Sequence, residues 1–172
     1  MHQKKWNPLS SELNCSESKL QNFASKILTE ELGCFSKKRR YSRVWVLLEG
    51  PLGAGKSRLV SEFLSELRIE RPAQGSPTFA LMHQYSCAAF QTVIHADLYR
   101  IERERELEDI GFWELASEEN TLCLIEWSDR VPELFQGLSR MLAPSTALIK
   151  IELALASSGD QNRRDLRASR WG

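Results

Sequence analysis

The chain has 172 residues, and its 23 Lys and Arg side chains balance its 23 Asp and Glu side chains, so the formal net charge is zero. This balance excludes a global field that would draw the protein to nucleic acid or to a membrane surface, and it leaves only local basic runs at residues 37–40 and 163–164, which are typical of solvated loops. The length is enough for one substantial core, so we expect a single domain.

No export signal is visible near the start of the sequence. Met1–Trp6 leads into polar sequence without an apolar core, and no apolar stretch approaches the length of a membrane span. The four cysteines form no CxxC pair and have no metal-ligand spacing, and Cys123 lies in an apolar run where a thiol behaves as a small buried hydrophobe. These features predict a soluble, cytoplasmic protein without disulfide bonds.

The first part of the chain predicts a leader, a helix and a strand. Residues 1–15 are expected to be a loose leader, so that the domain covers residues 16–172. From Ser16, apolar residues recur at helical spacing, and Gly33 stands where a C-terminal cap would be. Arg43–Leu48 is apolar almost throughout, which is typical of a central strand covered on both faces.

A glycine-rich loop follows this strand and precedes an amphipathic helix that ends near Arg68. It fits the pattern of glycine, four residues, glycine, lysine and serine, with the residues Gly50, Pro51, Leu52, Gly53, Ala54, Gly55, Lys56 and Ser57. Glycines allow positive φ and a close approach of backbone N–H groups to an anion, and the helix adds the positive end of its dipole. Lys56 would bind the outer phosphates and Ser57 would ligate Mg²⁺, so the loop predicts a nucleoside triphosphate site.

The segment after the loop helix predicts a loop and a hairpin. Ser76-Pro77-Thr78 has loop chemistry. Because a segment at this place is often ordered by the γ-phosphate and Mg²⁺ in nucleotide-hydrolysing proteins, Thr78 is a candidate site residue. Phe79–Cys87 and Gln91–Leu98 are strand-like and close together, so we expect an antiparallel hairpin.

The second half of the chain continues the alternation of strands and helices. Glu104–Ala116 predicts one helix with a solvated acidic face, and Ser128–Phe135 predicts a short helix. Thr146–Leu155 alternates apolar and polar residues, which favours an antiparallel or edge strand, and Arg163–Ala168 predicts a final strand. The fold class is therefore α/β, a mixed sheet with helices packed on both faces.

Two acidic residues are candidates for the metal and the reaction. The apolar run Thr121–Ile125 ends in Glu126, and a carboxylate beside a buried strand is costly to desolvate without a cation. This favours Glu126 as a Mg²⁺ contact over a strand-end residue that points to solvent. Asp97 shares a strand face with His95 and Tyr99, and it could contact a metal-bound water or orient the attacking water. His95 itself is more typical of a packed, hydrogen-bonded strand residue.

The sequence resembles the TsaE (formerly YjeE) family of small bacterial ATPases. The resemblance rests on GPLGAGKS, SPTF, HADLYR and LIEW, which start at residues 50, 76, 95 and 124, and it runs from about residue 16 to residue 168. It implies a P-loop NTPase-like fold, ATP and Mg²⁺ as ligands, and a part in making threonylcarbamoyladenosine at position 37 of tRNAs. In this family ATP hydrolysis is weak alone and matters in a complex with the TsaB and TsaD proteins, so any contact with tRNA could be indirect.

The resemblance also implies roles for single residues. Lys56 and Ser57 would be the phosphate and Mg²⁺ residues, and Thr78 would belong to a switch-like loop. Asp97 would be important for hydrolysis, Glu126 would supply the acidic metal contact, and Trp127 would lie beside the nucleotide. Two positions depart from the family pattern: Pro51 replaces an acidic or polar residue, and Arg58 replaces a threonine. Arg58 follows the phosphate-binding residues and could alter nucleotide affinity or contact a partner.

Two other functions share parts of this pattern. A small-molecule or nucleoside kinase would share the loop, but it needs a second substrate pocket and an arginine-bearing lid. The run Arg100–Arg105 interleaves acids with its arginines and is typical of a helix surface. A non-hydrolysing, nucleotide-gated binding subunit is disfavoured by the joint presence of Lys56, Ser57, Asp97 and Glu126. A GTPase is disfavoured because no Asn-Lys-x-Asp motif occurs.

Overall fold

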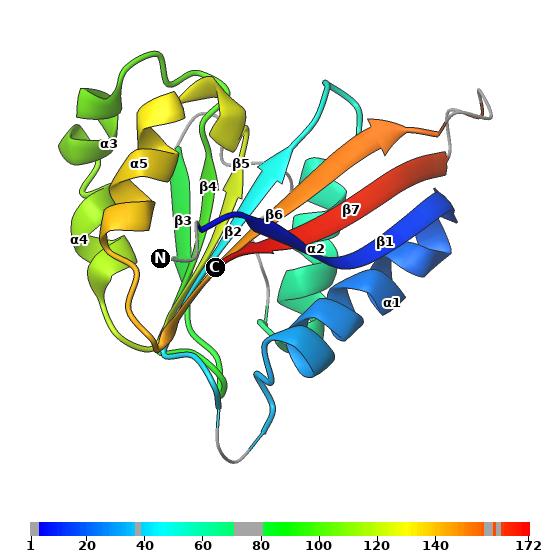
Figure 1. Ribbon diagram of the computed structural model, residues 1–172, viewed down its shortest axis with the longest axis horizontal. Helices are drawn as coiled ribbons and strands as arrows, with labels where there is room; N and C mark the ends of the chain where they lie inside the picture. Colours follow the sequence, from blue (N-terminus) through cyan, green and yellow to red (C-terminus); the bar gives the residue numbers. More distant parts are fainter. Residues whose placement is uncertain (1–3, 37–38, 71–80, 157–159, 161–162) are drawn as a thin grey trace.

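A single mixed sheet of seven strands, in the order β1-β7-β6-β2-β5-β4-β3, organises the computed structural model (Figure 1). The structure describes residues 4–36, 39–70, 81–156, 160 and 163–172. The middle strand β2 (Arg43–Glu49) runs parallel to β5 (Thr121–Glu126) on one side and to β6 (Thr146–Leu155) on the other, and β4 (Thr92–Asp97) runs parallel to β5. Val44–Leu48 is buried on both faces, which confirms the predicted central strand.

Antiparallel strands complete the sheet at both edges. β3 (Met82–Tyr85) pairs with β4 as the predicted hairpin. On the other side, β7 (Arg163–Trp171) is the predicted final strand, and it pairs with β6 and with β1 (Trp6–Ser16).

One strand prediction was wrong, and another is decided by the sheet. Residues 6–15 belong to β1 and not to a loose leader; two irregularities in the register, between Pro8 and Ser10 and between Glu12 and Cys15, disrupt the alternation that would have revealed the strand. The prediction for β6 left open an antiparallel or an edge strand: β6 pairs antiparallel with β7, which confirms the first alternative, and it lies inside the sheet with β2 parallel to it on the other side. Its alternation arises because Lys150 and Glu152 lie on a part of one face where they form ion pairs instead of packing in a core.

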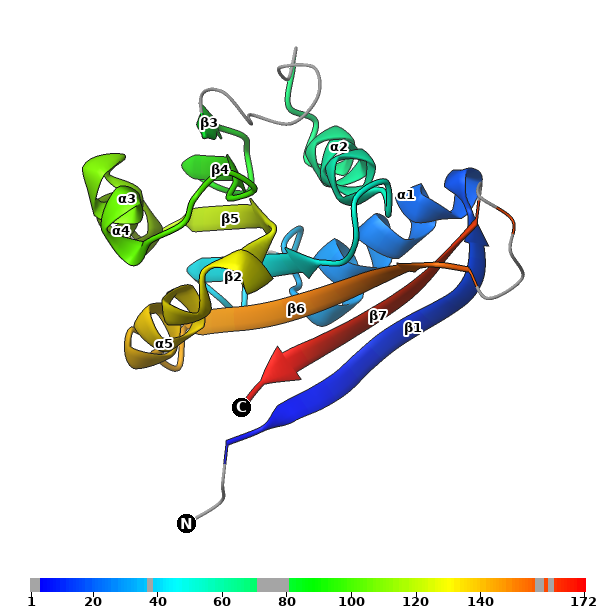
Figure 2. The same ribbon diagram turned by 90° about the horizontal axis from the view of Figure 1, so that it is seen from above.

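Helices cover both faces of the sheet, as predicted (Figure 2). α1 (Glu17–Lys26), continued by a π-helical turn at Ile27–Glu31, packs with α2 (Lys56–Glu66) on one face around Phe23 and Phe63. The other face carries α3 (Glu104–Asp109), α4 (Phe112–Ser117) and α5 (Pro132–Arg140) around a core that includes Trp45. No helix among the described residues is long and apolar enough to cross a membrane.

Local backbone chemistry corrects two helix boundaries. The helix predicted over Glu104–Ala116 is divided into α3 and α4, because Gly111 adopts φ 69° and stops the first helix. The short helix predicted over Ser128–Phe135 begins as a 3₁₀ turn at Ser128–Arg130 and restarts as α5 at Pro132, a residue suited to the first helical turn.

Removal of residues 1–16 should destabilise the protein strongly. β1 covers the edge of β7 and buries Cys15 completely, so a variant that starts at Glu17 should lose about 3 kcal/mol or more of unfolding free energy and should self-associate through the exposed edge. Urea denaturation and size-exclusion chromatography measure these effects. The control starts at Lys5 and keeps β1; equal stability of the two variants would contradict a structural role for this strand.

Candidate functional site

The phosphate loop connects β2 to α2 at the carboxyl end of the parallel strands. Gly50, Gly53 and Gly55 all have positive φ, at 143°, 75° and 94°. Gly50 also lies in close contact with β6, the strand beside β2 in the sheet, because a methyl group on its Cα would overlap the backbone oxygen of Leu153. The loop therefore has the backbone geometry of an anion cradle and is held against the sheet at its first residue.

Lys56 points into this loop. Its Nζ donates hydrogen bonds to the carbonyl oxygens of Gly50, at 2.7 Å, and Pro51, at 3.0 Å, and lies 3.3 Å from the centre of the Trp127 ring. Burial lowers the pKa of the Lys56 ammonium below its ordinary value, while the carboxylates of Glu126, Asp129 and Asp97 raise it in part. The ammonium is thus held among carbonyls, one aromatic face and acidic groups.

Glu126 joins the loop helix to the neighbouring strand. Its carboxylate is 1% exposed, and it accepts a hydrogen bond from Ser57 Oγ, at 2.7 Å, through one oxygen. Its other oxygen lies 2.7 Å from Nε2 of His95, which is also buried. Because a carboxylate only accepts hydrogen bonds, Nε2 carries the proton in this pair. His95 therefore belongs to the site, a contact that its strand pattern alone did not indicate.

Asp97 and Trp127 lie next to this pair. Asp97 is opposite Glu126 in the parallel register of β4 and β5, is 2% exposed, and accepts a hydrogen bond from the backbone N–H of Tyr99, at 2.9 Å. Trp127 follows β5 with φ 59°, and its ring lies 4.9 Å from the ring of Tyr99. The two acidic residues therefore end neighbouring strands, close to the base of the loop.

This donor set fits a magnesium ion that arrives with phosphates. The described residues contain no group of three His, Cys, Asp or Glu side chains able to hold a metal by themselves. Mg²⁺ commonly uses one or two protein oxygens and completes its shell with substrate phosphates and waters. Ser57 and Glu126, already 2.7 Å apart, provide such a pair, with Asp97 beside them.

The remaining predicted residues are less central. Arg58 pairs with Glu62 at 3.0 Å on the surface of α2, with a side chain that is 54% exposed. Leu52 is 76% exposed at the tip of the loop, whereas Ala54 is buried beneath it. Thr78 lies outside the described residues. Sequence reasoning missed Asp129, although it stands only three positions after Glu126.

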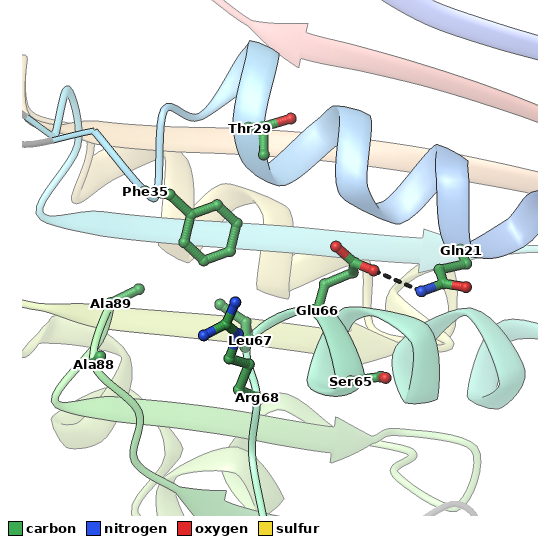
Figure 3. Close-up of a pocket in the computed structure, with 9 residues that line it drawn as sticks. All are labelled: Gln21, Thr29, Phe35, Ser65, Glu66, Leu67, Arg68, Ala88 and Ala89. Atoms are coloured by element: carbon green, nitrogen blue, oxygen red, sulfur yellow. Dashed lines mark hydrogen bonds between the residues drawn. The ribbon is translucent and has the colours of Figure 1, made fainter.

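A cavity of about 680 Å³ lies away from this site, between α1, α2 and the β3–β4 connection (Figure 3). Gln21 of α1 donates a hydrogen bond to Glu66 of α2 at its wall, at 2.9 Å. Glu66 is the last residue of α2 and Lys56 the first, so roughly 15 Å of helix separates the cavity from the phosphate loop. None of the predicted site residues that the structure describes lines this cavity.

The sequence matches a known family. A family model described as "Threonylcarbamoyl adenosine biosynthesis protein TsaE" matches residues 15–164. The chain belongs to the TsaE family.

Relatives in this family include a Rickettsia felis protein named tRNA threonylcarbamoyladenosine biosynthesis protein TsaE. It is 34% identical over 119 residues, which cover 69% of this chain and 61% of that protein. An Aquifex aeolicus protein of the same name is 31% identical over 126 residues, which cover 73% of this chain and 76% of that protein. The match to several TsaE relatives spans less than two thirds of their length, 49% for the Rickettsia conorii protein.

The fold agrees with this assignment. A crystal structure of Bacillus subtilis YdiB superposes with a TM-score of 0.60 at 19% identity, covering 100% of this chain and 90% of that chain. At this identity the likeness concerns the fold alone, and it agrees with the predicted α/β fold of one mixed sheet with helices on both faces.

Two glycine substitutions separate backbone conformation from crowding in the loop. We expect Gly50→Ala to reduce the free energy of unfolding by about 3 kcal/mol, because the methyl group would overlap Leu153 as well as strain the backbone. Gly53 also has positive φ, but a methyl group there would have no neighbour within 4 Å. We therefore expect Gly53→Ala to reduce the free energy of unfolding by about 1 kcal/mol. Urea denaturation compares the two variants, and losses of the same size would contradict the close contact with β6.

Proposed function

We propose that this TsaE-family chain binds ATP with Mg²⁺, hydrolyses ATP slowly, and acts as the ATPase subunit in making threonylcarbamoyladenosine at position 37 of tRNAs. The observation that carries the nucleotide proposal is the convergence of Lys56, Ser57 and Glu126 at one glycine-rich loop. Family membership supports the role in tRNA modification.

The loop amides and Lys56 would bind the phosphates. Three glycines with positive φ let successive N–H groups face one concavity, and the amino end of α2 favours negative charge there. An incoming phosphate would draw the Lys56 ammonium away from the Gly50 and Pro51 carbonyls, because a charge-assisted hydrogen bond is stronger than one to a neutral carbonyl. The Trp127 ring limits where the ammonium can move.

Ser57 and Glu126 would hold Mg²⁺, which neutralises charge on the terminal phosphates. The hydrogen bond from His95 to one oxygen of the Glu126 carboxylate would hold the carboxylate in place, so that its other oxygen remains directed at Ser57. Asp97, adjacent to Glu126, would position the attacking water or a metal-bound water, and Thr78 would belong to a loop that responds to the γ-phosphate. Alignment and charge stabilisation are the main requirements of phosphoryl transfer.

Partner proteins would control the rate of ATP hydrolysis. By analogy with the family, we propose that the protein works in the cytoplasm with TsaB and TsaD, and that its nucleotide state controls docking to them. Such a role suits a low intrinsic turnover. The four cysteines are free thiols, as suits a reducing compartment.

The kinase alternative makes a different prediction about structure. A kinase lid would present unpaired arginines above the phosphate loop. The Arg100–Arg105 region instead leads into α3, where the Glu106 carboxylate caps the backbone N–H groups of Glu102 and Arg103 at 3.0 Å. This is the behaviour of a capped surface helix, and it favours the hydrolase over the kinase.

Lys56→Ala should abolish productive nucleotide binding. We expect the dissociation constants for ATP and ADP to rise at least about 100-fold, because the ammonium and its charge-assisted contacts to phosphate are lost. Titration with a fluorescent ATP analogue in the presence of Mg²⁺ measures this. Lys19→Ala on the exposed side of α1 is the control for removal of one positive charge; similar affinity in both variants would argue against the phosphate loop as the binding site.

Asp97→Asn should separate binding from turnover. We expect ATP affinity to stay within about 3-fold of the wild type and the turnover number, with partners added, to fall about 100-fold, because the amide keeps the size but not the charge that orients water. The measurements are phosphate release and nucleotide titration. Asp109→Asn in α3 is the matched control, and loss of affinity with unchanged turnover of bound ATP would refute the role assigned to Asp97.

A further inference from the structure

A second cation reaches the phosphate loop from the far end of the sequence. A methyl group on Gly55 would lie 3.5 Å from Nε of Arg164, a residue of β7. Gly55 is the last loop residue before Lys56 and forms the N-cap of α2. The Arg164 guanidinium therefore lies beside the backbone that would carry the phosphates. The Arg163-Arg164 pair was interpreted from the sequence as part of a solvated loop.

The position of Arg164 in β7 determines the face of the sheet on which its side chain lies. Leu166 and Ala168 of β7 are buried in the core beneath α1 and α2, and side chains two and four positions apart share one face of a strand. Arg164 therefore faces the α2 side. Arg167, at an odd spacing, lies on the opposite face and is exposed. The Arg164 side chain is half-buried, and its Nη1 donates a hydrogen bond to the backbone oxygen of Arg163, at 2.9 Å.

The strand order indicates which part of a nucleotide Arg164 would meet. Glu126 and Asp97 end β5 and β4 on one side of β2, whereas Arg164 comes from beyond β6 on the other side. Terminal phosphates that share Mg²⁺ with Ser57 and Glu126 would occupy the β5 side. The inner phosphate and the nucleoside would then extend toward β6 and β7.

The two arginines near the loop are arranged differently. Arg58, in the first turn of α2, forms an ion pair with Glu62 one turn later along the surface of the same helix. Arg164 instead extends from β7 to the loop backbone beside Gly55, so the second cation next to the loop is supplied by β7 and not by the loop helix.

We infer that Arg164 is a nucleotide-binding residue that contacts the inner phosphate of the nucleotide, beside Gly55 and on the β6–β7 side of the loop. This inference rests on the proposed nucleotide function and adds a contact to the same site. A guanidinium offers several N–H donors in one plane, so it can keep its bond to the Arg163 carbonyl and still donate to a phosphate oxygen. The contact is with a phosphate shared by ATP and ADP, so it contributes to binding and not to the reaction at the γ-phosphate.

Arg164→Ala tests this inference in the full chain. The dissociation constants for ADP and ATP should both rise, by the same factor of roughly 10- to 100-fold, which is the effect expected for a hydrogen bond to a charged group. The turnover number at saturating ATP should stay within about 3-fold of the wild type. Arg164→Lys keeps the charge without the planar donor fork and should show an intermediate loss. Arg140→Ala, which removes an exposed arginine at the end of α5 on the other face of the sheet, should bind both nucleotides as the wild type does.

Thermal unfolding of each variant without nucleotide shows whether the fold is intact, and Arg164→Lys provides the affinity test if the alanine variant is unstable. A loss of ATP affinity with unchanged ADP affinity would overturn the inner-phosphate contact, because it would place Arg164 at the γ-phosphate. A lower turnover number with unchanged affinity would overturn it too. Unchanged affinities in both variants would refute the inference and leave the proposed function standing, whereas failure of the wild type to bind either nucleotide would refute the proposed function itself.

Discussion

The buried carboxylate of Glu126 is the constraint on which the site depends. It is 1% exposed, and its two oxygens are held by Ser57 from α2 and by His95 from β4. An unpaired carboxylate at this depth would be strongly destabilising, so α2, β4 and β5 must assemble in one register for the chain to fold. The same register places Asp97 opposite Glu126. Folding and the arrangement of the acidic groups are therefore a single requirement.

Local patterns were sufficient to predict the centre of the molecule. The apolar runs of β2 and β5, the glycine-rich loop and the acidic residues at strand ends are short-range features, and parallel strands necessarily bring such ends to one edge of a sheet. The contacts of His95 with Glu126 and of Arg164 with the loop depend on which strands are neighbours. That order is decided by packing between distant segments, so no pattern within one segment could reveal it.

The periphery was harder to predict, for identifiable physical reasons. Register irregularities in β1 break its alternation, so that it resembled unstructured sequence. Gly111 divides one apolar periodicity into two helices, although its neighbours continue the helical pattern. In β6 the polar positions form ion pairs on the sheet, and the alternation alone did not decide between a strand with an antiparallel neighbour and an edge strand. In each case tertiary context overrode a local rule.

The pairing of β1 with β7 also has a consequence for how the protein is made. Asn7 donates a side-chain hydrogen bond to the backbone oxygen of Gly172 across 165 positions. During synthesis on the ribosome, β1 must wait for its partner strand to emerge, and until then its backbone groups are available to other chains. The sheet can therefore close only after β7 has left the ribosome, and chaperones that shield an early strand would be most useful during that interval.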